Sequence, residues 1–280
     1  MGDYAKDVLV ETQWVEDHLD DDSIRIVEVD ENPALYAEAH IPGAIGFDWQ
    51  KDLQDQVKRD FLGPQEFGVL VGSRGISNDH TVVLYGDRNN WFAAYTYWYL
   101  KYYGHDRVLL MNGPREKWIE EGRPTSTDAP SHPAAKFQAQ GPDESIRSKR
   151  DEVLKLIGTD TRLVDVRSPQ EFSGELIAMA GYEQEGAQRG GHIPGAISVP
   201  WAQAVKEDGT FKSADELREL YQGKGALNGD DIVAYCRIGE RSAHTWFVLH
   251  ELLGKDNVRN YDGSWTEWGN MVAVPVEKDV

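Results

Sequence analysis

The stretches "YAEAHIPGAIGFDW" (residues 36–49) and "QRGGHIPGAISVPW" (residues 188–201) are two versions of one pattern, and each contains the run His-Ile-Pro-Gly-Ala-Ile. Three further pairs of similar segments occur in the same order in both halves of the chain: 25–33 with 162–170, 79–87 with 230–238, and 112–118 with 261–268. The spacing of about 150 residues is far longer than the 20–50-residue period of solenoid repeats. The chain therefore contains a duplicated domain.

Each half alternates short β-rich runs with helical patterns. This alternation predicts an α/β domain with a mainly parallel sheet flanked by helices. Ser213 and Glu216 have the spacing of a capping box at the start of one helix. The expected strands are 24–29, 44–47, 81–86 and 107–113 in the first half and 162–166, 196–201, 231–236 and 258–263 in the second, with helices at 151–158, 213–223 and 242–254.

The length also favours two domains, because 280 residues is the size at which single cores stop growing and chains divide. Residues 126–143 are rich in Pro, Ser, Ala and Gly and show no sustained period, so we expect a linker that runs over the surface. The predicted organisation is a domain at 1–125, a linker at 126–143 and a second domain at 144–280.

The formal net charge of −19 argues against nucleic acids and anionic membranes as partners, because like charges repel. No run approaches the 18 apolar residues of a membrane span, and the first residues do not resemble a signal peptide. We therefore expect a cytoplasmic protein. A single cysteine forms no intramolecular disulfide and offers no pair for a zinc site, so we expect no metal.

The duplication serves as an internal control, because motifs present in both halves are explained by the shared fold. His40 and His192 are such a pair, and we expect them to fix a turn by hydrogen bonds rather than to catalyse. The halves differ at the end of one predicted strand, where Gly86 of the first half stands opposite Cys236 of the second. We therefore expect domain 144–280 to be catalytic and domain 1–125 to be non-catalytic.

A lone cysteine is most often a buried, inert side chain. Cys236, however, follows a predicted strand, and ligands of open α/β sheets bind beyond the carboxyl ends of strands. Arg237 and Arg241 flank it in an otherwise acidic protein. We expect the next helix to begin near Ser242, the loop amides to point inward, and the pKa of the Cys236 thiol to be lowered. The local pattern indicates a nucleophilic thiolate in an anion-binding loop.

The spacing from Cys236 to Arg241 is C-x4-R, whereas cysteine phosphatases need C-x5-R, a position that Ser242 occupies here. Glu240 would also repel a phosphate dianion if it turned inward. A phosphatase or arsenate reductase is therefore disfavoured, and the shorter loop suits one added sulfur atom, as in a persulfide.

The chain resembles the tandem-domain rhodaneses, which are thiosulfate sulfurtransferases. Residues 36–47 match the N-terminal signature of that family, residues 261–268 match its C-terminal signature, and Cys236–Arg241 has the place and length of its six-residue active loop. The resemblance implies two rhodanese-like domains, each with a five-stranded parallel sheet, of which only the second is catalytic. It also implies sulfur transfer without a cofactor.

By this resemblance, the Cys236 thiolate attacks the sulfane sulfur of thiosulfate, sulfite leaves, and a Cys236 persulfide remains. A cyanide or thiol acceptor, including a thiol of another protein, then takes the sulfur. Arg241 would hold the sulfonate of the donor, and Arg237 would add to the positive field. The predicted substrate-binding residues are Arg237, Ile238, Gly239, Glu240, Arg241, Ser242 and Arg189.

Two alternatives remain open for the donor and the role. Ile238 stands where some thiosulfate enzymes have a lysine, so Arg241 or Arg189 would have to supply a second basic contact. The 3-mercaptopyruvate enzymes have small, uncharged loop residues, from which Arg237 and Glu240 depart, so thiosulfate is favoured. The other alternative is a persulfide carrier or sulfur-relay module with little turnover. Arg167, which matches Asp30 of the first half, is a further candidate to face the site.

Overall fold

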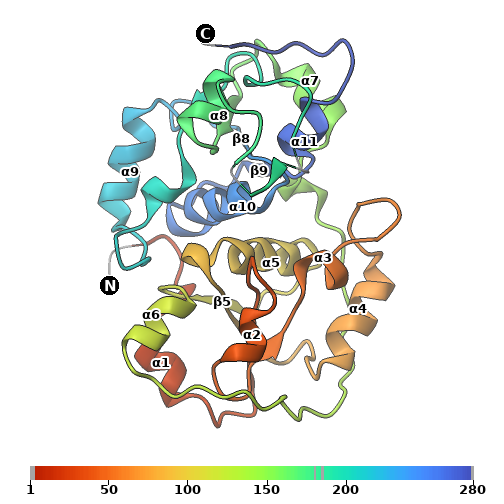
Figure 1. The fold of residues 1–280 in the computed structure, drawn as a ribbon, viewed down its shortest axis with the longest axis vertical. Coiled ribbons are helices and arrows are strands. Elements are labelled where there is room, and N and C mark those ends of the chain that lie inside the picture. The colour runs from red at the N-terminus through yellow and green to blue at the C-terminus, as the bar shows by residue number, and fades with distance from the viewer. Residues whose placement is uncertain (1–3, 180, 184–185, 279–280) are drawn as a thin grey trace. The chain divides into compact units, whose positions relative to one another are not determined.

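The computed structural model describes residues 4–179, 181–183 and 186–278. The chain separates into two compact units, each built on one parallel sheet (Figure 1). We call Val8–Asp143 together with Val205–Phe211 the N-terminal unit, and Glu144–Ala204 together with Lys212–Val280 and the segment up to Asp7 the C-terminal unit. The predicted α/β class is confirmed in both.

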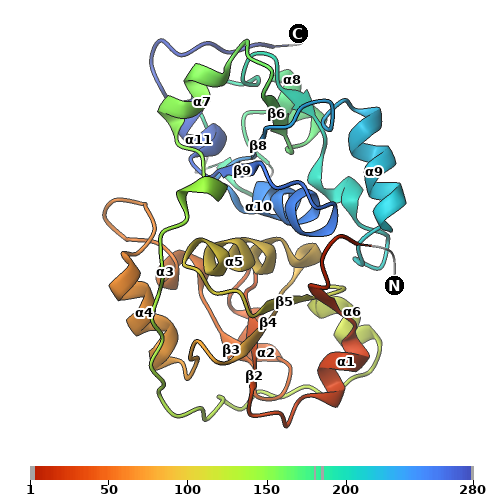
Figure 2. The same ribbon diagram turned by 180° about the vertical axis from the view of Figure 1, so that it is seen from behind.

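The sheet of the N-terminal unit has five parallel strands in the order β1-β5-β4-β2-β3. Its central strands are buried on both faces, as expected when helices cover a parallel sheet. Helix α5, rich in buried aromatic residues, packs on β4 and β5 (Figure 2). The strands are β1 (Leu9–Val10), β2 (Ile24–Glu28), β3 (Ile45–Gly46), β4 (Thr81–Tyr85) and β5 (Val108–Met111), and the helices are α1 (Thr12–Asp17), α2 (Leu35–Glu38), α3 (Trp49–Asp52), α4 (Pro64–Ser73), α5 (Trp91–Tyr102) and α6 (Arg115–Glu120).

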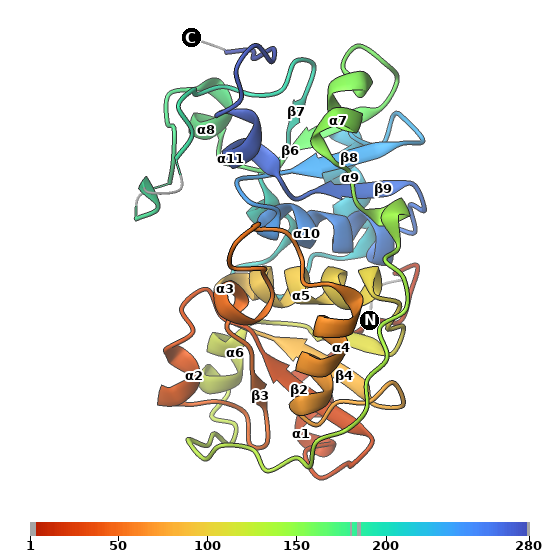
Figure 3. The same ribbon diagram turned by 90° about the vertical axis from the view of Figure 1, so that its right-hand side faces the viewer.

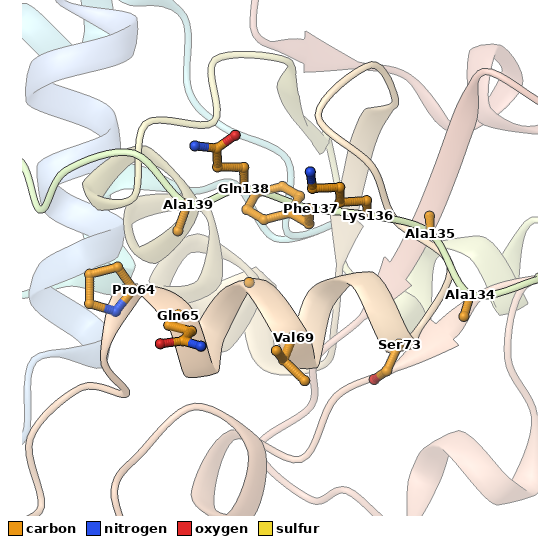
Figure 4. Close-up of a pocket in the computed structure, with 11 residues that line it drawn as sticks. Pro64, Gln65, Val69, Ser73, Ala134, Ala135, Lys136, Phe137, Gln138 and Ala139 are labelled. Atoms are coloured by element: carbon orange, nitrogen blue, oxygen red, sulfur yellow. The ribbon is translucent and has the colours of Figure 1, made fainter.

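Residues 126–143, which we expect to be a linker, lie along the N-terminal unit. The Ala135 amide donates to the Gly72 carbonyl at 2.8 Å, and the Phe137 side chain is buried. A Cβ atom on Gly72 would lie 2.5 Å from the Ala135 oxygen, so the close approach requires glycine there. Figure 4 shows the pocket of about 660 Å³ that α4 and residues 134–139 line.

The sheet of the C-terminal unit has the order β7-β6-β8-β9 in the described part of the chain (Figure 3). The implied fifth strand is reduced to a single parallel bridge between Arg147 and Asn260. The strands are β6 (Arg162–Asp165), β7 (Ile197–Ser198), β8 (Ile232–Tyr235) and β9 (Val258–Tyr261), and the helices are α7 (Arg150–Leu156), α8 (Pro169–Ser173), α9 (Ala214–Gly223), α10 (Glu240–Trp246) and α11 (Ser264–Trp268).

The sequence predicts where two helices of the C-terminal unit begin, and the structure can be compared with both predictions. The capping box before α9 is confirmed, because the Ser213 hydroxyl accepts from the Glu216 amide and the Glu216 carboxylate accepts from the Ser213 amide. The helix expected to begin near Ser242 is present, with a start that differs by two residues. Helix α10 begins two residues earlier, because Gly239 adopts a φ of 100° that non-glycine residues rarely adopt and turns the chain into the helix.

The strand registers show that the two sheets are built alike. Glu28 pairs with Tyr85 in the N-terminal unit, and Asp165 pairs with Tyr235 in the C-terminal unit. Gly86 and Cys236 therefore follow equivalent strand positions, as predicted. Among the described residues, no helix is long and apolar enough to span a membrane.

Candidate active site

Cys236 directly follows β8, an inner strand of its sheet, so it lies at the carboxyl end where parallel sheets bind ligands. Its amide donates to the Ser264 hydroxyl at 3.0 Å, and its carbonyl accepts from the Trp265 amide at 3.0 Å. Both partners belong to the first turn of α11. The backbone of the cysteine is thus fixed by the second signature segment, residues 261–268.

The Cys236 sulfur lies among polar groups of its own loop. The Gly239 amide donates to Sγ at 3.1 Å, and the Ser242 hydroxyl lies 3.5 Å from it. The thiol donates to Glu240 Oε2 at 3.1 Å. The expected inward-pointing amide is therefore present at Gly239, but a carboxylate turns inward beside it.

The expected lowering of the thiol pKa is wrong for this structure. Burial raises the pKa of Cys236, and the negative charge of Glu240 raises it further. The charge of Arg241 and the hydrogen bond from Ser242 oppose this rise without overcoming it. The sequence contained both arginines, but it could not show that Glu240 is the charged group in contact with the sulfur. At neutral pH the resting residue is a thiol.

Glu240 is buried yet ionised, because two arginines face it. Burial opposes its ionisation, but the charges of Arg237 and Arg241 and the hydrogen bond from Cys236 bring its pKa below the usual value. Arg237 lies 3.1 Å from Oε1 and Arg241 Nε lies 3.6 Å from the same oxygen. The Ile238 amide donates to Oε2 at 3.2 Å.

Arg241, the predicted sulfonate ligand, forms a bidentate pair with Glu171 of α8 at 3.0 and 3.2 Å. Burial opposes the ionisation of Glu171, but this arginine holds its pKa at about 2. The guanidinium of Arg237 lies over the ring of Tyr182, 4.1 Å from its centroid. Both predicted arginines of the cysteine loop are thus paired with a carboxylate in this structure.

Arg189 lies in a different setting. Its guanidinium donates to the backbone carbonyls of Gly269, Val274, Trp268 and Met271 at 2.7 to 3.3 Å. These bonds tie the segment after α11 to the loop before His192. Contact between Arg189 and a donor stays a prediction.

Asn260 is a site residue that the sequence analysis missed. It is buried on β9, its amide group donates to the Gly239 carbonyl at 3.0 Å, and it accepts from the Ser242 hydroxyl at 2.6 Å. By strand register, Leu110 holds the equivalent position in the N-terminal unit. Comparison of the two copies could have revealed Asn260, because it is a polar residue in a buried strand at the position where the first copy has a leucine.

Three other singled-out residues have structural partners. Arg167 is buried and donates to Asp165 at 2.6 Å and to the Gly191 carbonyl at 2.7 Å. His40 and His192 are confirmed as turn residues, since His40 Nδ1 lies 2.8 Å from the Tyr36 carbonyl and His192 Nδ1 lies 2.9 Å from the Phe172 carbonyl.

A protein-family model matches the chain twice, once in each of the two duplicated halves. The model described as "Rhodanese-like domain" matches residues 11–121 and again residues 149–271. The chain belongs to the rhodanese-like family. The cysteine loop described above lies inside the second match, and Gly86 lies inside the first.

Relatives extend this similarity over the whole chain. A protein of Haloferax volcanii named "Putative thiosulfate sulfurtransferase" is 59% identical over 282 residues, 99% of this chain and 98% of the relative. The "Sulfur carrier protein TtuD" of Thermus thermophilus is 57% identical and covers 99% of both chains. Among solved structures, an EanB variant in complex with ergothioneine, covalently linked with a cysteine persulfide, has a TM-score of 0.83 and 27% identity over 97% of this chain and 70% of that one.

Proposed function

We propose that this protein is a thiosulfate sulfurtransferase and that Cys236 carries the transferred sulfur. The observation that supports it best is the placement of Cys236. Its sulfur accepts a hydrogen bond from the Gly239 amide at the end of β8, in the one rhodanese-like copy that has a cysteine there. The name of the Haloferax volcanii relative supports the same donor.

In the proposed reaction, Cys236 Sγ attacks the sulfane sulfur of thiosulfate. The bond between the two thiosulfate sulfurs breaks, its electron pair leaves with sulfite, and a Cys236 persulfide anion remains. The Gly239 amide, which already donates to Sγ, is positioned to stabilise negative charge on sulfur. The second step passes the outer sulfur to cyanide, a small thiol or a protein thiol.

The sulfonate of the donor is proposed to bind at Arg237 and Arg241. Each arginine pairs with a carboxylate in this structure, Arg237 with Glu240 and Arg241 with Glu171. Donor binding then requires the guanidinium groups to share or exchange these partners. Because planar guanidinium groups present five N–H donors, one of them can hold a carboxylate and a sulfonate oxygen together.

The remaining assignments are part of the same proposal. The domain at 144–280 is catalytic, the domain at 1–125 is not, and the protein acts in the cytoplasm on small sulfur donors. The net charge of −19 supports the exclusion of nucleic acids and anionic membranes as partners. A sulfur-carrier role is the second candidate, favoured by the name of the Thermus thermophilus relative. 3-Mercaptopyruvate remains the alternative donor.

The test is thiocyanate formation from cyanide with thiosulfate or 3-mercaptopyruvate, by the wild-type protein and by Cys236→Ser. We expect turnover with thiosulfate and a loss of at least about 10³-fold in the variant, as when other enzymes lose their nucleophile. Mass spectrometry of the thiosulfate-treated protein should show a gain of about 32 Da, one sulfur atom, at Cys236.

The other outcomes separate the alternatives. Turnover with 3-mercaptopyruvate alone would reassign the donor and leave Cys236 as the nucleophile. A 32 Da gain without turnover would favour the sulfur carrier. Full activity in Cys236→Ser would overturn the proposal.

A further inference from the structure

A buried carboxylate in contact with the nucleophile needs a chemical explanation. Glu240 is 1% exposed, and its Oε2 lies 3.1 Å from Cys236 Sγ. Its position is held by Arg237, Arg241 and the Ile238 amide. A carboxylate that served only to repel anions in the solvent would lie at the surface. Glu240 is buried instead, and its carboxylate points at the sulfur of Cys236.

We propose that Glu240 is the proton acceptor for Cys236, so that the pair shares one proton throughout the sulfur-transfer cycle. This inference rests on the proposed function. The Cys236 thiol must lose its proton before it attacks a sulfur donor, and Glu240 Oε2 accepts the hydrogen bond of that thiol.

The other charged groups around the pair do not compete for this role. Arg237 and Arg241 stay protonated in proteins. Glu171 contacts Arg241, and Asp165 contacts Arg167. Facing the loop from the end of β9, Asp262 pairs with Arg147 at 2.9 Å. His244 follows on α10, where burial lowers its pKa to about 3 and keeps it neutral.

The first step balances with the proton retained on the pair. The thiol proton moves to Glu240 Oε2 as the Sγ lone pair forms a bond to the sulfane sulfur of thiosulfate. The bond between the thiosulfate sulfurs breaks and sulfite leaves with its electron pair. The reactants, a thiol, a carboxylate and a dianion, have the same total charge as the products, which are a persulfide anion, a carboxylic acid and sulfite.

The second step reverses the proton transfer. An anionic acceptor takes the outer sulfur, the Cys236–sulfur bond breaks with its electron pair on Sγ, and Glu240 returns the proton to Sγ. The neutral Glu240 of the intermediate would also donate a hydrogen bond to the persulfide, which removes the repulsion that an ionised carboxylate would exert there.

A proton shared by Cys236 and Glu240 gives persulfide formation a characteristic pH dependence. The reactive pair holds one proton, and this state persists between the pKa of Glu240 and that of Cys236. Since burial raises the thiol pKa and the two arginines bring the carboxyl pKa below its usual value, the window is wider than for isolated groups. The rate constant for persulfide formation should therefore be constant from about pH 5.5 to 8.

The experiment is single-turnover persulfide formation with excess thiosulfate as a function of pH, without cyanide. In Glu240→Gln the reactive species becomes the thiolate, so the rate constant should rise about tenfold per pH unit below the thiol pKa, which iodoacetamide alkylation measures independently. Glu240→Asp retains a carboxylate and should keep a flat profile at a lower rate. Glu171→Gln, which removes a carboxylate from Arg241 but not from Sγ, is the matched control and should also keep a flat profile.

The outcomes separate this inference from the function on which it rests. If wild-type protein forms persulfide with a rate constant that rises tenfold per pH unit, Glu240 is not the acceptor, even if Glu240→Gln does not fold. A flat profile in Glu240→Gln at pH values below its measured thiol pKa would equally exclude Glu240 as the acceptor. Absence of any 32 Da gain in the wild type defeats the proposed function itself.

Discussion

The loops that follow β4 and β8 begin from equivalent strand ends and differ in what their polar groups contact. In the N-terminal unit the Gly86 amide donates to the Asn90 side chain at 2.8 Å, and Asn90 in turn donates to the carbonyls of Met111 and Gly113. In the C-terminal unit the amide of Cys236 bonds to Ser264, outside the loop. One loop is closed by its own side chain, whereas the other points an amide at a sulfur atom.

This difference shows that the shared fold places a loop at the same strand end in both units, and that the loop sequence decides whether a reactive group lies there. Arg88, Asn89 and Asn90 all have positive φ values, between 46° and 62°, so the N-terminal loop curls back on itself. In the other loop only Gly239 has a positive φ among the five residues after the strand. In the N-terminal loop the amide of Gly86 is bound by the loop's own Asn90 side chain, whereas in the C-terminal loop the amide of Gly239 donates to the Cys236 sulfur.

The largest expected effect is a loss of stability on substitution of Gly86, the glycine that the N-terminal copy has in place of Cys236. A Cβ atom on Gly86 would lie 2.0 Å from the Val29 carbonyl oxygen, a backbone atom that cannot move aside cheaply. Gly86→Ala should therefore destabilise the N-terminal unit by about 3 kcal/mol. Differential scanning calorimetry should show a transition lowered by roughly 10 °C.

Gly223→Ala is the matched control, because a Cβ atom there meets nothing within 4 Å and the backbone is helical. It should leave the calorimetric transitions unchanged or slightly raised. An unchanged transition in Gly86→Ala would mean that the two loops do not differ in packing as described.

Much of this architecture could be predicted, because the repeated His-Ile-Pro-Gly-Ala-Ile segments and the strand patterns are local signals. The place of Cys236 followed from comparing the two copies. The direction of its pKa shift did not, since it depends on Glu240 turning back from the first turn of α10 toward the sulfur. The pairing of Arg241 with Glu171 joins residues 70 positions apart, and no local pattern specifies such a contact.

The next effect concerns Asn260, the buried amide opposite Leu110 in the other copy. Asn260→Leu installs the side chain of the N-terminal copy and removes the two hydrogen bonds that the Asn260 side chain forms with Gly239 and Ser242. The Gly239 amide should then be less well aimed at Sγ. We expect kcat to fall by roughly 10- to 100-fold, less than when a direct oxyanion donor is lost, with little change in KM.

The KM-against-kcat split distinguishes this positioning role from a loss of folded protein, which would leave the KM and kcat of the folded fraction unchanged. The rate constant should be expressed per folded molecule, because the Ser242 hydroxyl and the Gly239 carbonyl each lose a buried hydrogen bond, at a cost of about 1–3 kcal/mol of stability, although the carbonyl keeps the Ala243 amide as a donor. A normal kcat for the folded fraction would show that Asn260 only supports the fold.

A third difference between the two units concerns the charged residues at the end of β2 and of β6. The C-terminal unit has the ion pair of Asp165 and Arg167, whereas the equivalent residues of the N-terminal unit are two carboxyls, Glu28, which pairs with Arg115 at 3.3 Å, and Asp30. Burial, then the hydrogen bond and charge of Glu28, raises the pKa of Asp30 to about 9. Burial also raises the pKa of Asp87, to about 7.

This contrast predicts the smallest effect, a loss of stability in the N-terminal unit at alkaline pH. Folded Asp30 keeps its proton up to about pH 9, whereas the unfolded residue loses it near pH 4, so the unfolded state binds fewer protons in between. The free energy of unfolding should therefore fall by about 1.4 kcal/mol per pH unit. Between about pH 7.5 and 8.5 Asp87 is mostly ionised in both states, which leaves Asp30 and its neighbour Glu28, whose pKa burial also raises, as the groups responsible.

Asp30→Asn should remove this slope, because an amide occupies the same space and holds no titrating proton. Hydrogen exchange of β4 and α5 amides between pH 7.5 and 8.5, corrected for intrinsic exchange rates, reports the opening of the N-terminal unit alone. Asp208→Asn is the control: its hydrogen bond to Thr210 holds its pKa at about 2, so it is ionised in both states and adds no slope there. A slope that persists in Asp30→Asn would assign the proton to Glu28 instead, and a wild-type protein without any slope would mean that the carboxyl pair is ionised like its counterpart beside Arg167.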